Sequence, residues 1–343
     1  MDGSNLAPGP YAGRNVLVTG ADGFIGSHLT EALTRGGAHV TALCLYNSFD
    51  TLGWLDDLAP DLRARINAVR GDLRDAAMMQ RLAARQEVIF HLGALIAIPH
   101  SYVAAQSYVD TNILGTLNVL EAARTHETPR VVHTSTSEVY GTAQTVPIDE
   151  RHPLQGQSPY SATKIGADML AESFARAHDL PVAILRPFNT YGPRQSERAV
   201  IPTLIRQALD PAVEAIRIGD LTPVRDFTFV EDTVAAFLAI GSEPSILHGA
   251  PYNAGSGRAA TIADVLALLR EICACDKRVA LEGRRMRPAN SEVRELLADA
   301  SRLTAATGWQ AQVGLRDGLV RTVEWWRRRL ADGLVRRETG YAT

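Results

Sequence analysis

Tyr160 and Lys164 stand four residues apart in the segment SPYSATK. On a helix, residues with this spacing share a face, so the phenol and the ammonium group can lie together. A nearby ammonium charge lowers the pKa of a tyrosine, and the phenolate can take a proton from a hydroxyl group. The pair therefore predicts a base for the oxidation of an alcohol, although the same spacing also arises by chance on helix surfaces.

A carboxylate lies a short way before this pair. The segment TSTSEVYG, residues 134–141, places Glu138 directly after two hydroxyl residues, Thr136 and Ser137. Such a carboxylate is either a working base or part of a polar turn. The segment alone leaves both interpretations open.

Three glycines form a candidate cradle for a phosphate group. The segment VTGADGFIG places Gly20, Gly23 and Gly26 after an apolar run and at the start of a helical pattern. Glycines permit a tight turn, so a pyrophosphate can lie against the free amides of a helix N-terminus. The spacing G-x-x-G-x-x-G differs from G-x-G-x-x-G. The strand before it and the helix after it favour dinucleotide binding over a simple turn.

The identity of the dinucleotide depends on two further positions. In GDLRD, Asp72 could accept a hydrogen bond from an adenine amino group, or it could cap a helix. The end of the second strand, where an acid normally holds the ribose hydroxyls, reads Cys44, Leu45 and Tyr46, with neither acid nor arginine. We expect NAD or NADP, with NAD slightly favoured, although these positions do not decide between the two.

Apolar runs of strand length alternate with helical patterns and must position these residues. The expected strands cover 15–20, 39–45, 66–71, 87–93, 130–136 and 182–188. Such alternation predicts an α/β fold, a Rossmann-like doubly wound parallel sheet covered on both faces. Right-handed crossovers join its strands.

The pattern loosens after about residue 188, where Pro, Gly and Arg become more frequent. We expect a smaller C-terminal α/β substrate lobe over 188–335, with helices at 200–209, 229–240, 261–273 and 314–331. The dinucleotide domain should cover 13–187, and the chain should return to it around 225–260. Residues 1–12 and 336–343 are expected to be tails.

Composition excludes several classes of protein. The net charge of −3 gives no overall basic surface, so we expect no nucleic-acid partner. The three cysteines, Cys44, Cys273 and Cys275, form neither a disulfide framework nor a metal site, which fits a reducing cytoplasm. The apolar stretch at 92–98 is too short to span a bilayer, and the first residues lack a signal-peptide pattern. We expect a soluble cytoplasmic protein without a membrane segment.

Taken in order, the motifs resemble those of the extended short-chain dehydrogenase/reductase family of nucleotide-sugar enzymes, over nearly the whole chain. The matching pieces are TGADGFIG, GDLRD, HLGA, the N-x-x-G-T of 112–116, TSTSEVYG, SPYSATK, RPFNTYGPRQ, RDFTFVEDT, NAGSG and RPANSE. The resemblance implies a Rossmann domain with tightly bound NAD(P) and a C-terminal lobe that holds a nucleoside-diphosphate sugar. The usual first step oxidises C4 of that sugar.

The resemblance also assigns site residues. The implied cofactor contacts are Gly20, Gly23, Phe24, Ile25, Gly26, Asp72, Leu73, Leu92, Gly93, Ala94, Tyr160 and Lys164. The implied substrate contacts are Ser101, Asn189, Arg225 and Arg287, because guanidinium groups suit diphosphate oxygens. No metal ligand is implied.

Glu138 decides between branches of the family. A 4,6-dehydratase must remove the C5 proton, and the resemblance makes Glu138 that base, with Thr136 bonded to the C4 oxygen; 4-epimerases carry a small or neutral residue there. The dTDP-glucose 4,6-dehydratases carry an Asp acid where this chain has Ser137, whereas GDP-mannose 4,6-dehydratases share Thr-Ser-Glu. UDP-xylose synthases have a similar motif, so a UDP-glucuronate decarboxylase or a 4-epimerase stays as an alternative.

The longer phrases, such as HLGALIAIPHSY, are most similar to the N-acetylglucosamine-nucleotide 4,6-dehydratases of legionaminic-acid-type pathways. We therefore expect an NAD(P)-dependent lyase acting on a UDP- or GDP-linked hexose or N-acetylhexosamine. Relatives commonly dimerise, which implies a homodimer through 103–126 and 160–178. A non-catalytic NAD(P)-sensing protein is the remote alternative, but such relatives typically lose the tyrosine or the lysine.

Overall fold

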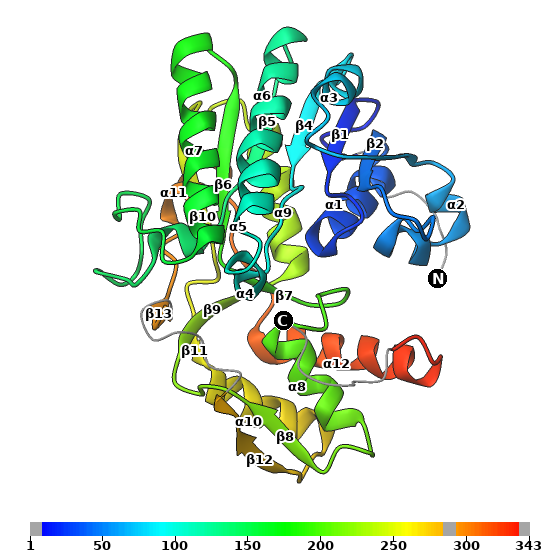
Figure 1. The fold of residues 1–343 in the computed structure, drawn as a ribbon, viewed down its shortest axis with the longest axis vertical. Helices are drawn as coiled ribbons and strands as arrows, with labels where there is room; N and C mark the ends of the chain where they lie inside the picture. Colours follow the sequence, from blue (N-terminus) through cyan, green and yellow to red (C-terminus); the bar gives the residue numbers. More distant parts are fainter. Residues whose placement is uncertain (1–8, 284–292, 336–343) are drawn as a thin grey trace.

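A parallel sheet of seven strands forms the upper part of the molecule (Figure 1). The computed structural model describes residues 9–283 and 293–335. In sheet order β10-β6-β5-β4-β1-β2-β3, every neighbouring pair is parallel. The strands are β1 (Asn15–Thr19), β2 (His39–Leu45), β3 (Asn67–Gly71), β4 (Val88–His91), β5 (Val131–Thr134), β6 (Val182–Pro187) and β10 (Pro251–Ala254). All six expected strands are present, and the doubly wound α/β prediction is confirmed.

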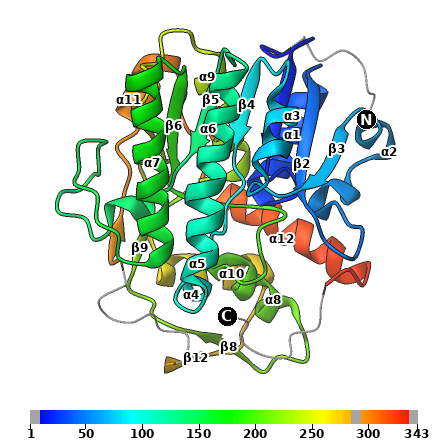
Figure 2. The same ribbon diagram turned by 45° about the horizontal axis from the view of Figure 1, so that its top comes forward.

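Helices cover both faces of this sheet because alternate strand residues point to opposite sides. Val16 and Val18 pack in a core with α1 (Phe24–Arg35) and α9 (Val230–Ser242). Leu17 packs on the other face with α3 (Ala76–Ala83), α6 (Gly115–Thr125) and α7 (Pro159–His178). Figure 2 shows α6 and α7 side by side in front of the strands.

The smaller lobe lies beneath the large sheet in Figure 1. A central strand, β9 (Val224–Phe229), pairs with β7 (Asn189–Tyr191), β11 (Ala259–Thr261) and β13 (Glu295–Leu296). A second pair joins β8 (Ala215–Ile218) to β12 (Arg278–Leu281). The remaining helices of this lobe are α8 (Val200–Leu209), α10 (Ile262–Cys273) and α12 (Leu315–Ala331), and α11 (Ser301–Thr307) lies beside β10. The helices α8, α9, α10 and α12 begin within one residue of the starts expected from the sequence.

Several short elements gather where the strands of the large sheet end. They are η1 (Gly53–Asp57), α4 (Ile98–Ser101), α5 (Ala105–Tyr108), the π-helix η2 (Val109–Leu114) and the 3-10 helix η3 (Ser137–Tyr140). The short helix α2 (Pro60–Arg63) lies instead just before the start of β3. The strand order reverses between β1 and β4, and ligands of such sheets bind at the carboxyl ends beside that point. In the ranges described, no helix is long and apolar enough to cross a membrane.

Candidate active site

The glycine turn after β1 leaves no room for side chains. Gly20 has a φ of +67°, and a Cβ there would lie 2.8 Å from the Cα of Gly93. A Cβ on Gly26 would lie 2.0 Å from the carbonyl oxygen of Gly20. Gly23 caps α1 without a side-chain hydrogen bond, so the first amides of the helix, at Phe24 and Ile25, stay available. This backbone cradle fits a pyrophosphate.

A buried histidine fixes the segment that follows β4 and lies against the glycine turn. His91 contacts the hydroxyls of Thr19 (2.8 Å, at Nδ1) and Thr116 (3.0 Å, at Nε2). Because Thr116 donates to the carbonyl of Asn112, it must accept from Nε2–H, so Nδ1 accepts from Thr19. Thr19 in turn accepts from the amide of Gly93 (3.1 Å). Burial keeps the pKa of His91 low, and the neutral ring thereby fixes the segment Leu92–Gly93–Ala94.

The segment after β3 also packs against the segment after β4, since a Cβ on Gly93 would lie 2.7 Å from Leu73. The carboxylate of Asp72 accepts hydrogen bonds from Nε of Arg74 at 3.0 Å, and this contact lowers the pKa of Asp72. Asp75, not Asp72, caps α3 by accepting from the amide of Met78. The alternative interpretation of Asp72 as a helix cap is therefore wrong.

Tyr160 and Lys164 lie on the buried face of α7, which begins at a capping box around Ser158. Tyr160 packs against Ile98 and Tyr108, and Lys164 Nζ donates to the carbonyl oxygen of Thr134 at 2.6 Å. Burial lowers the pKa of Lys164 to about 8.

The sequence-based expectation of a lowered tyrosine pKa is wrong for this arrangement. Burial raises the pKa of Tyr160 well above its ordinary value, and the negative charge of Glu138 raises it further. A hydrogen bond with Thr136 acts in the opposite direction, but it does not outweigh burial.

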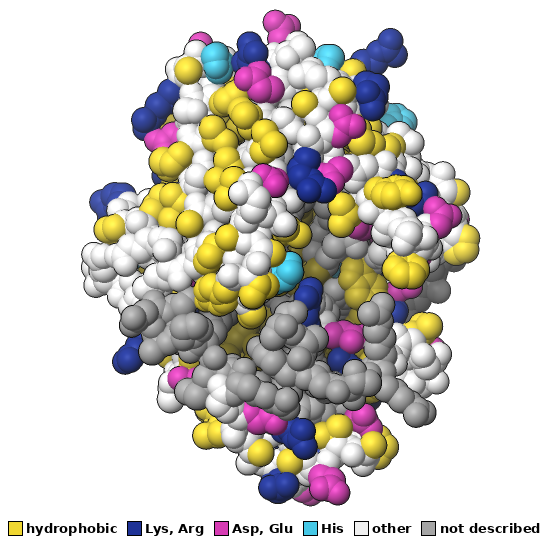
Figure 3. Space-filling model, in the orientation of Figure 1, with side chains coloured by type: hydrophobic (Ala, Val, Ile, Leu, Met, Phe, Trp, Pro, Cys, Tyr) yellow, Lys and Arg dark blue, Asp and Glu magenta, His cyan; other side chains and the backbone are white. Residues whose placement is uncertain are grey.

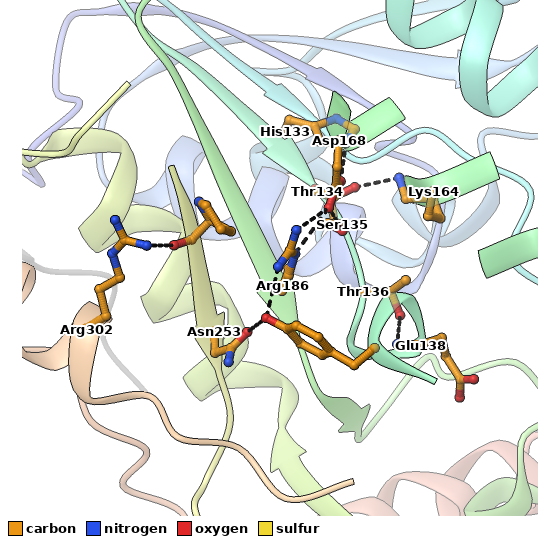
Figure 4. Close-up of polar contacts among 12 residues, drawn as sticks. His133, Thr134, Ser135, Thr136, Glu138, Lys164, Asp168, Arg186, Asn253 and Arg302 are labelled. Carbon is orange, nitrogen blue, oxygen red and sulfur yellow. Dashed lines mark hydrogen bonds and ion pairs between the residues drawn. The ribbon is translucent and has the colours of Figure 1, made fainter. Parts of the chain in front are cut away.

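The TSTSEVYG segment forms the end of β5 and the 3-10 helix η3. Thr136 caps η3 by accepting from the amide of Glu138 at 3.2 Å (Figure 4). Ser137 is buried, and Glu138 is half-buried. In Figure 4 the carboxylate of Glu138 points away from the Asp168 side of the strand. Thr136, Glu138 and Tyr160 thus meet at the carboxyl end of β5.

A buried carboxylate that the sequence analysis did not single out lies behind this strand (Figure 4). Asp168 accepts from Ser135 Oγ at 2.7 Å and from Arg186 Nε and Nη2 at 3.1 and 2.9 Å. His133 Nε2 contacts its other oxygen at 3.2 Å. Asp168 stands four residues after Lys164, on the same face of α7, and this spacing could have pointed to it in the sequence.

The network continues toward β10. Arg186 Nη1 donates to the hydroxyl of Tyr140 at 3.0 Å, and that hydroxyl donates to Oδ1 of Asn253 at 2.6 Å. Burial raises the pKa of Tyr140 to about 12, so it remains a donor. Side chains from β5, α7, β6 and β10 are thereby joined directly behind the Thr136–Glu138 segment.

The expected substrate contacts lie on two paired strands and on α4. Asn189 begins β7 in register with Phe227 of β9, and its buried Oδ1 has no hydrogen-bond partner within 9–283 and 293–335. Arg225, also on β9, is buried and donates to the carbonyl of Val224 at 2.9 Å. Ser101 is buried and donates to the carbonyl of Ile98. Arg287 lies outside the described residues.

Comparisons with known proteins agree with this geometry. The protein family described as GDP-mannose 4,6 dehydratase matches residues 17–322. A dTDP-glucose 4,6-dehydratase of Actinoplanes sp. is 33% identical over 91% of this chain and 97% of its own. A UDP-glucose 4-epimerase of Mycolicibacterium smegmatis is 32% identical over 91% and 98%. The crystal structure of DesIV, a dTDP-glucose 4,6-dehydratase of Streptomyces venezuelae with NAD and TYD bound, superposes with a TM-score of 0.82 at 30% identity, covering 92% of this chain and 98% of that chain.

Proposed function

The chain belongs to the family described as GDP-mannose 4,6 dehydratase, and from this premise we propose that it is an NAD-dependent nucleoside-diphosphate-sugar 4,6-dehydratase. It converts its substrate to a 4-keto-6-deoxy sugar. The observation that carries the proposal is the carboxylate of Glu138 close enough to Tyr160 to act on the phenol, at the end of β5. A reaction confined to C4 has no need of that second base.

A nicotinamide, when bound, would supply the oxidant for C4 and return the hydride to C6. Tyr160 takes the proton of the C4 hydroxyl, and Thr136, already bonded to the phenol, donates to the C4 oxygen. Burial keeps the phenol protonated in the structure, so the positive charges of Lys164, one helical turn further on, and of a bound oxidised nicotinamide would be needed to favour the phenolate.

Glu138 removes the proton from C5, which is acidic beside the C4 ketone. The C6 hydroxyl then leaves as water and requires a proton. Ser137 is a poor acid, so Glu138 passes the proton that it took from C5 to the leaving C6 hydroxyl. One water is lost, and the C5 position of the product carries a proton from solvent.

Turnover in heavy water tests the proposal. The UDP-, GDP- and dTDP-linked forms of glucose, mannose and N-acetylglucosamine, together with UDP-glucuronate, are incubated with the protein and followed by mass spectrometry. We expect one of them to lose one water and gain one solvent deuterium. Loss of carbon dioxide from UDP-glucuronate would establish a decarboxylase instead. Unchanged mass with inverted C4, as a 4-epimerase gives, would equally refute the dehydratase.

The variant Glu138→Gln isolates the second step. It should lower dehydration by about 10²–10⁴-fold, the usual contribution of a general base. The matched control is Glu271→Gln, which changes an exposed carboxylate on α10 that pairs with Arg316. Full activity in Glu138→Gln would remove the residue from the mechanism.

We propose NAD, tightly held, as the cofactor. The glycine cradle fits its pyrophosphate, and the DesIV structure contains NAD. Chromatography of the nucleotide released from the denatured protein tests the assignment, because NAD and NADP separate cleanly.

We also propose a homodimer. Apolar side chains gather over α5, η2, α6 and α7 on the face seen in Figure 3, and the exposed ones include Val109, Leu114 and Met169. These belong to the expected face, 103–126 with 160–178. Light scattering should give twice the mass of the chain, and Leu114→Asp should reduce it to that of a monomer.

A further inference from the structure

The end of β2 lacks the acid that normally binds the adenosine ribose, but the structure brings a carboxylate there from another segment. The amide of Leu45, the last residue of β2, donates to Oδ2 of Asp22 at 3.2 Å. Asp22 belongs to the glycine turn, between Gly20 and Gly23. Its side chain therefore crosses from the end of β1 to the end of β2.

Three backbone contacts fix Asp22 in this position. The amide of Ala21 donates to the carbonyl of Leu43 in β2, and the amide of Trp54 donates to the carbonyl of Asp22 at 3.1 Å. Gly53 has a φ of +57°, and a Cβ there would lie 2.5 Å from the carbonyl oxygen of Asp22. The chain after β2 thus packs directly on the glycine turn, and the carboxylate is held at the strand end.

The order of the strands places a ribose beside this carboxylate. The pyrophosphate cradle follows β1, and Asp72, the expected adenine contact, follows β3. Because β2 lies between β1 and β3 in the sheet, a dinucleotide that reaches from the cradle to Asp72 must pass the end of β2. The sugar between its pyrophosphate and its adenine is the part that passes there.

The carboxylate is short of hydrogen-bond donors. Burial raises the pKa of Asp22, and the interactions that oppose this shift are backbone hydrogen bonds. Within 9–283 and 293–335, no lysine or arginine forms an ion pair with Asp22. Arg70, on the neighbouring strand, is paired with Asp50 at 2.8 Å. A carboxylate with free lone pairs can accept from two adjacent hydroxyls.

We propose that Asp22 replaces the missing acid of β2, accepting hydrogen bonds from the hydroxyls of the adenosine ribose and excluding the 2′-phosphate of NADP. A 2′-phosphate would place like charge against the carboxylate and remove the donor it binds. The inference rests on the proposed function, which requires a bound dinucleotide. The rival is a 2′-phosphate held by Arg70, which would reverse the preference.

Binding measurements on the full chain, depleted of nucleotide, test the inference without reference to turnover. Calorimetry gives dissociation constants for NAD, NADP and the NAD analogue with 2′-deoxyadenosine. Hydrogen bonds to a charged group are worth about 1.5–3 kcal/mol, so Asp22→Asn should weaken NAD binding about 10–100-fold. The variant should also lose the discrimination between NAD and its 2′-deoxy analogue and approach equal affinity for NAD and NADP. Asp22→Ala, which leaves no acceptor, should weaken NAD binding further than Asp22→Asn, whose amide oxygen can still accept a hydrogen bond.

Asp56→Asn is the matched control. Its carboxylate lies in the same segment but accepts from Thr51 Oγ1 and the amide of Leu52, so the ratio of NAD to NADP affinity should stay unchanged. Equal weakening of NAD and NADP in Asp22→Asn would make Asp22 a structural support of β2 and overturn the inference. If the wild type prefers NADP, the rival interpretation, in which Arg70 holds the 2′-phosphate, would be favoured. If the wild type binds neither dinucleotide, the proposed function fails together with the inference.

Discussion

Replacing Asp168 with alanine removes a carboxylate that three buried side chains contact. Its oxygens accept from Ser135 and from two nitrogens of Arg186, and His133 contacts it at 3.2 Å. Although burial alone would raise the pKa of Asp168, the hydrogen bond with His133 and the charge of Arg186 lower it overall. The carboxylate is therefore ionised in the folded protein and balances the charge of Arg186.

The expected cost follows from burial. The side chains of Asp168 and Arg186 are 0% and 3% exposed, so water cannot replace the lost partner. Breaking a buried ion pair by removing one member typically costs about 3–5 kcal/mol, because the other charge remains buried. Asp168→Asn should cost less, since its amide oxygen can still accept from Ser135 or Arg186.

Equilibrium unfolding in urea, followed by circular dichroism, measures this cost. The free energy of unfolding of Asp168→Ala should fall by about 3–5 kcal/mol. The control is Glu271→Ala, which removes an exposed partner of Arg316 and should leave the midpoint unchanged. A loss below about 1 kcal/mol in Asp168→Ala would mean that the buried charge of Arg186 does not require the carboxylate of Asp168, which would refute this reasoning.

Two further predictions concern the cradle and the lysine. Gly26→Ala should weaken NAD binding, as calorimetry can show, because the added Cβ would lie 2.0 Å from the carbonyl oxygen of Gly20 and must displace the cradle. Gly314→Ala, whose Cβ would meet nothing closer than 3.9 Å, should bind NAD as the wild type does. For Lys164, the pKa in the folded protein is about 8, below the ordinary value of 10.5. Between these pH values the unfolded chain binds one more proton than the folded protein, so the contribution of Lys164 to the free energy of unfolding rises with pH. Lys164→Met should abolish this rise, which amounts to about 3 kcal/mol by pH 10.5 in urea unfolding; equal pH dependence in both proteins would contradict it.

Local patterns were sufficient to predict six strands of the large sheet and the four longer helices after residue 188. The apolar run HVTALCL gives β2 with the expected bounds, His39–Leu45, because the strand is buried on both faces of the sheet. The helix expected at 200–209 is α8 itself, since its apolar residues recur with helical period. The motif order along the chain also led to the family.

Properties that depend on three-dimensional neighbours could not be read in the same way. The pKa of Tyr160 is set by its burial against Ile98 and Tyr108, which come from segments more than fifty residues earlier. Arg186 meets Asp168 only because β6 lies beside β5 in the sheet. The carboxylate of Asp22 reaches the end of β2 through the fold of the glycine turn, so searching β2 itself for an acid could not find it.

The strand β10 has a consequence for how the protein is made. It pairs with β6 at one edge of the large sheet, yet it lies more than sixty residues later in the chain. Until residue 254 has left the ribosome, β6 is an edge strand whose open hydrogen-bonding groups can capture other chains. The α8 and β9 segments of the smaller lobe are synthesised in between, so the larger domain cannot finish folding before much of the smaller one exists. Cutting the chain after β6 would likewise leave an aggregation-prone fragment and not an independent dinucleotide-binding unit.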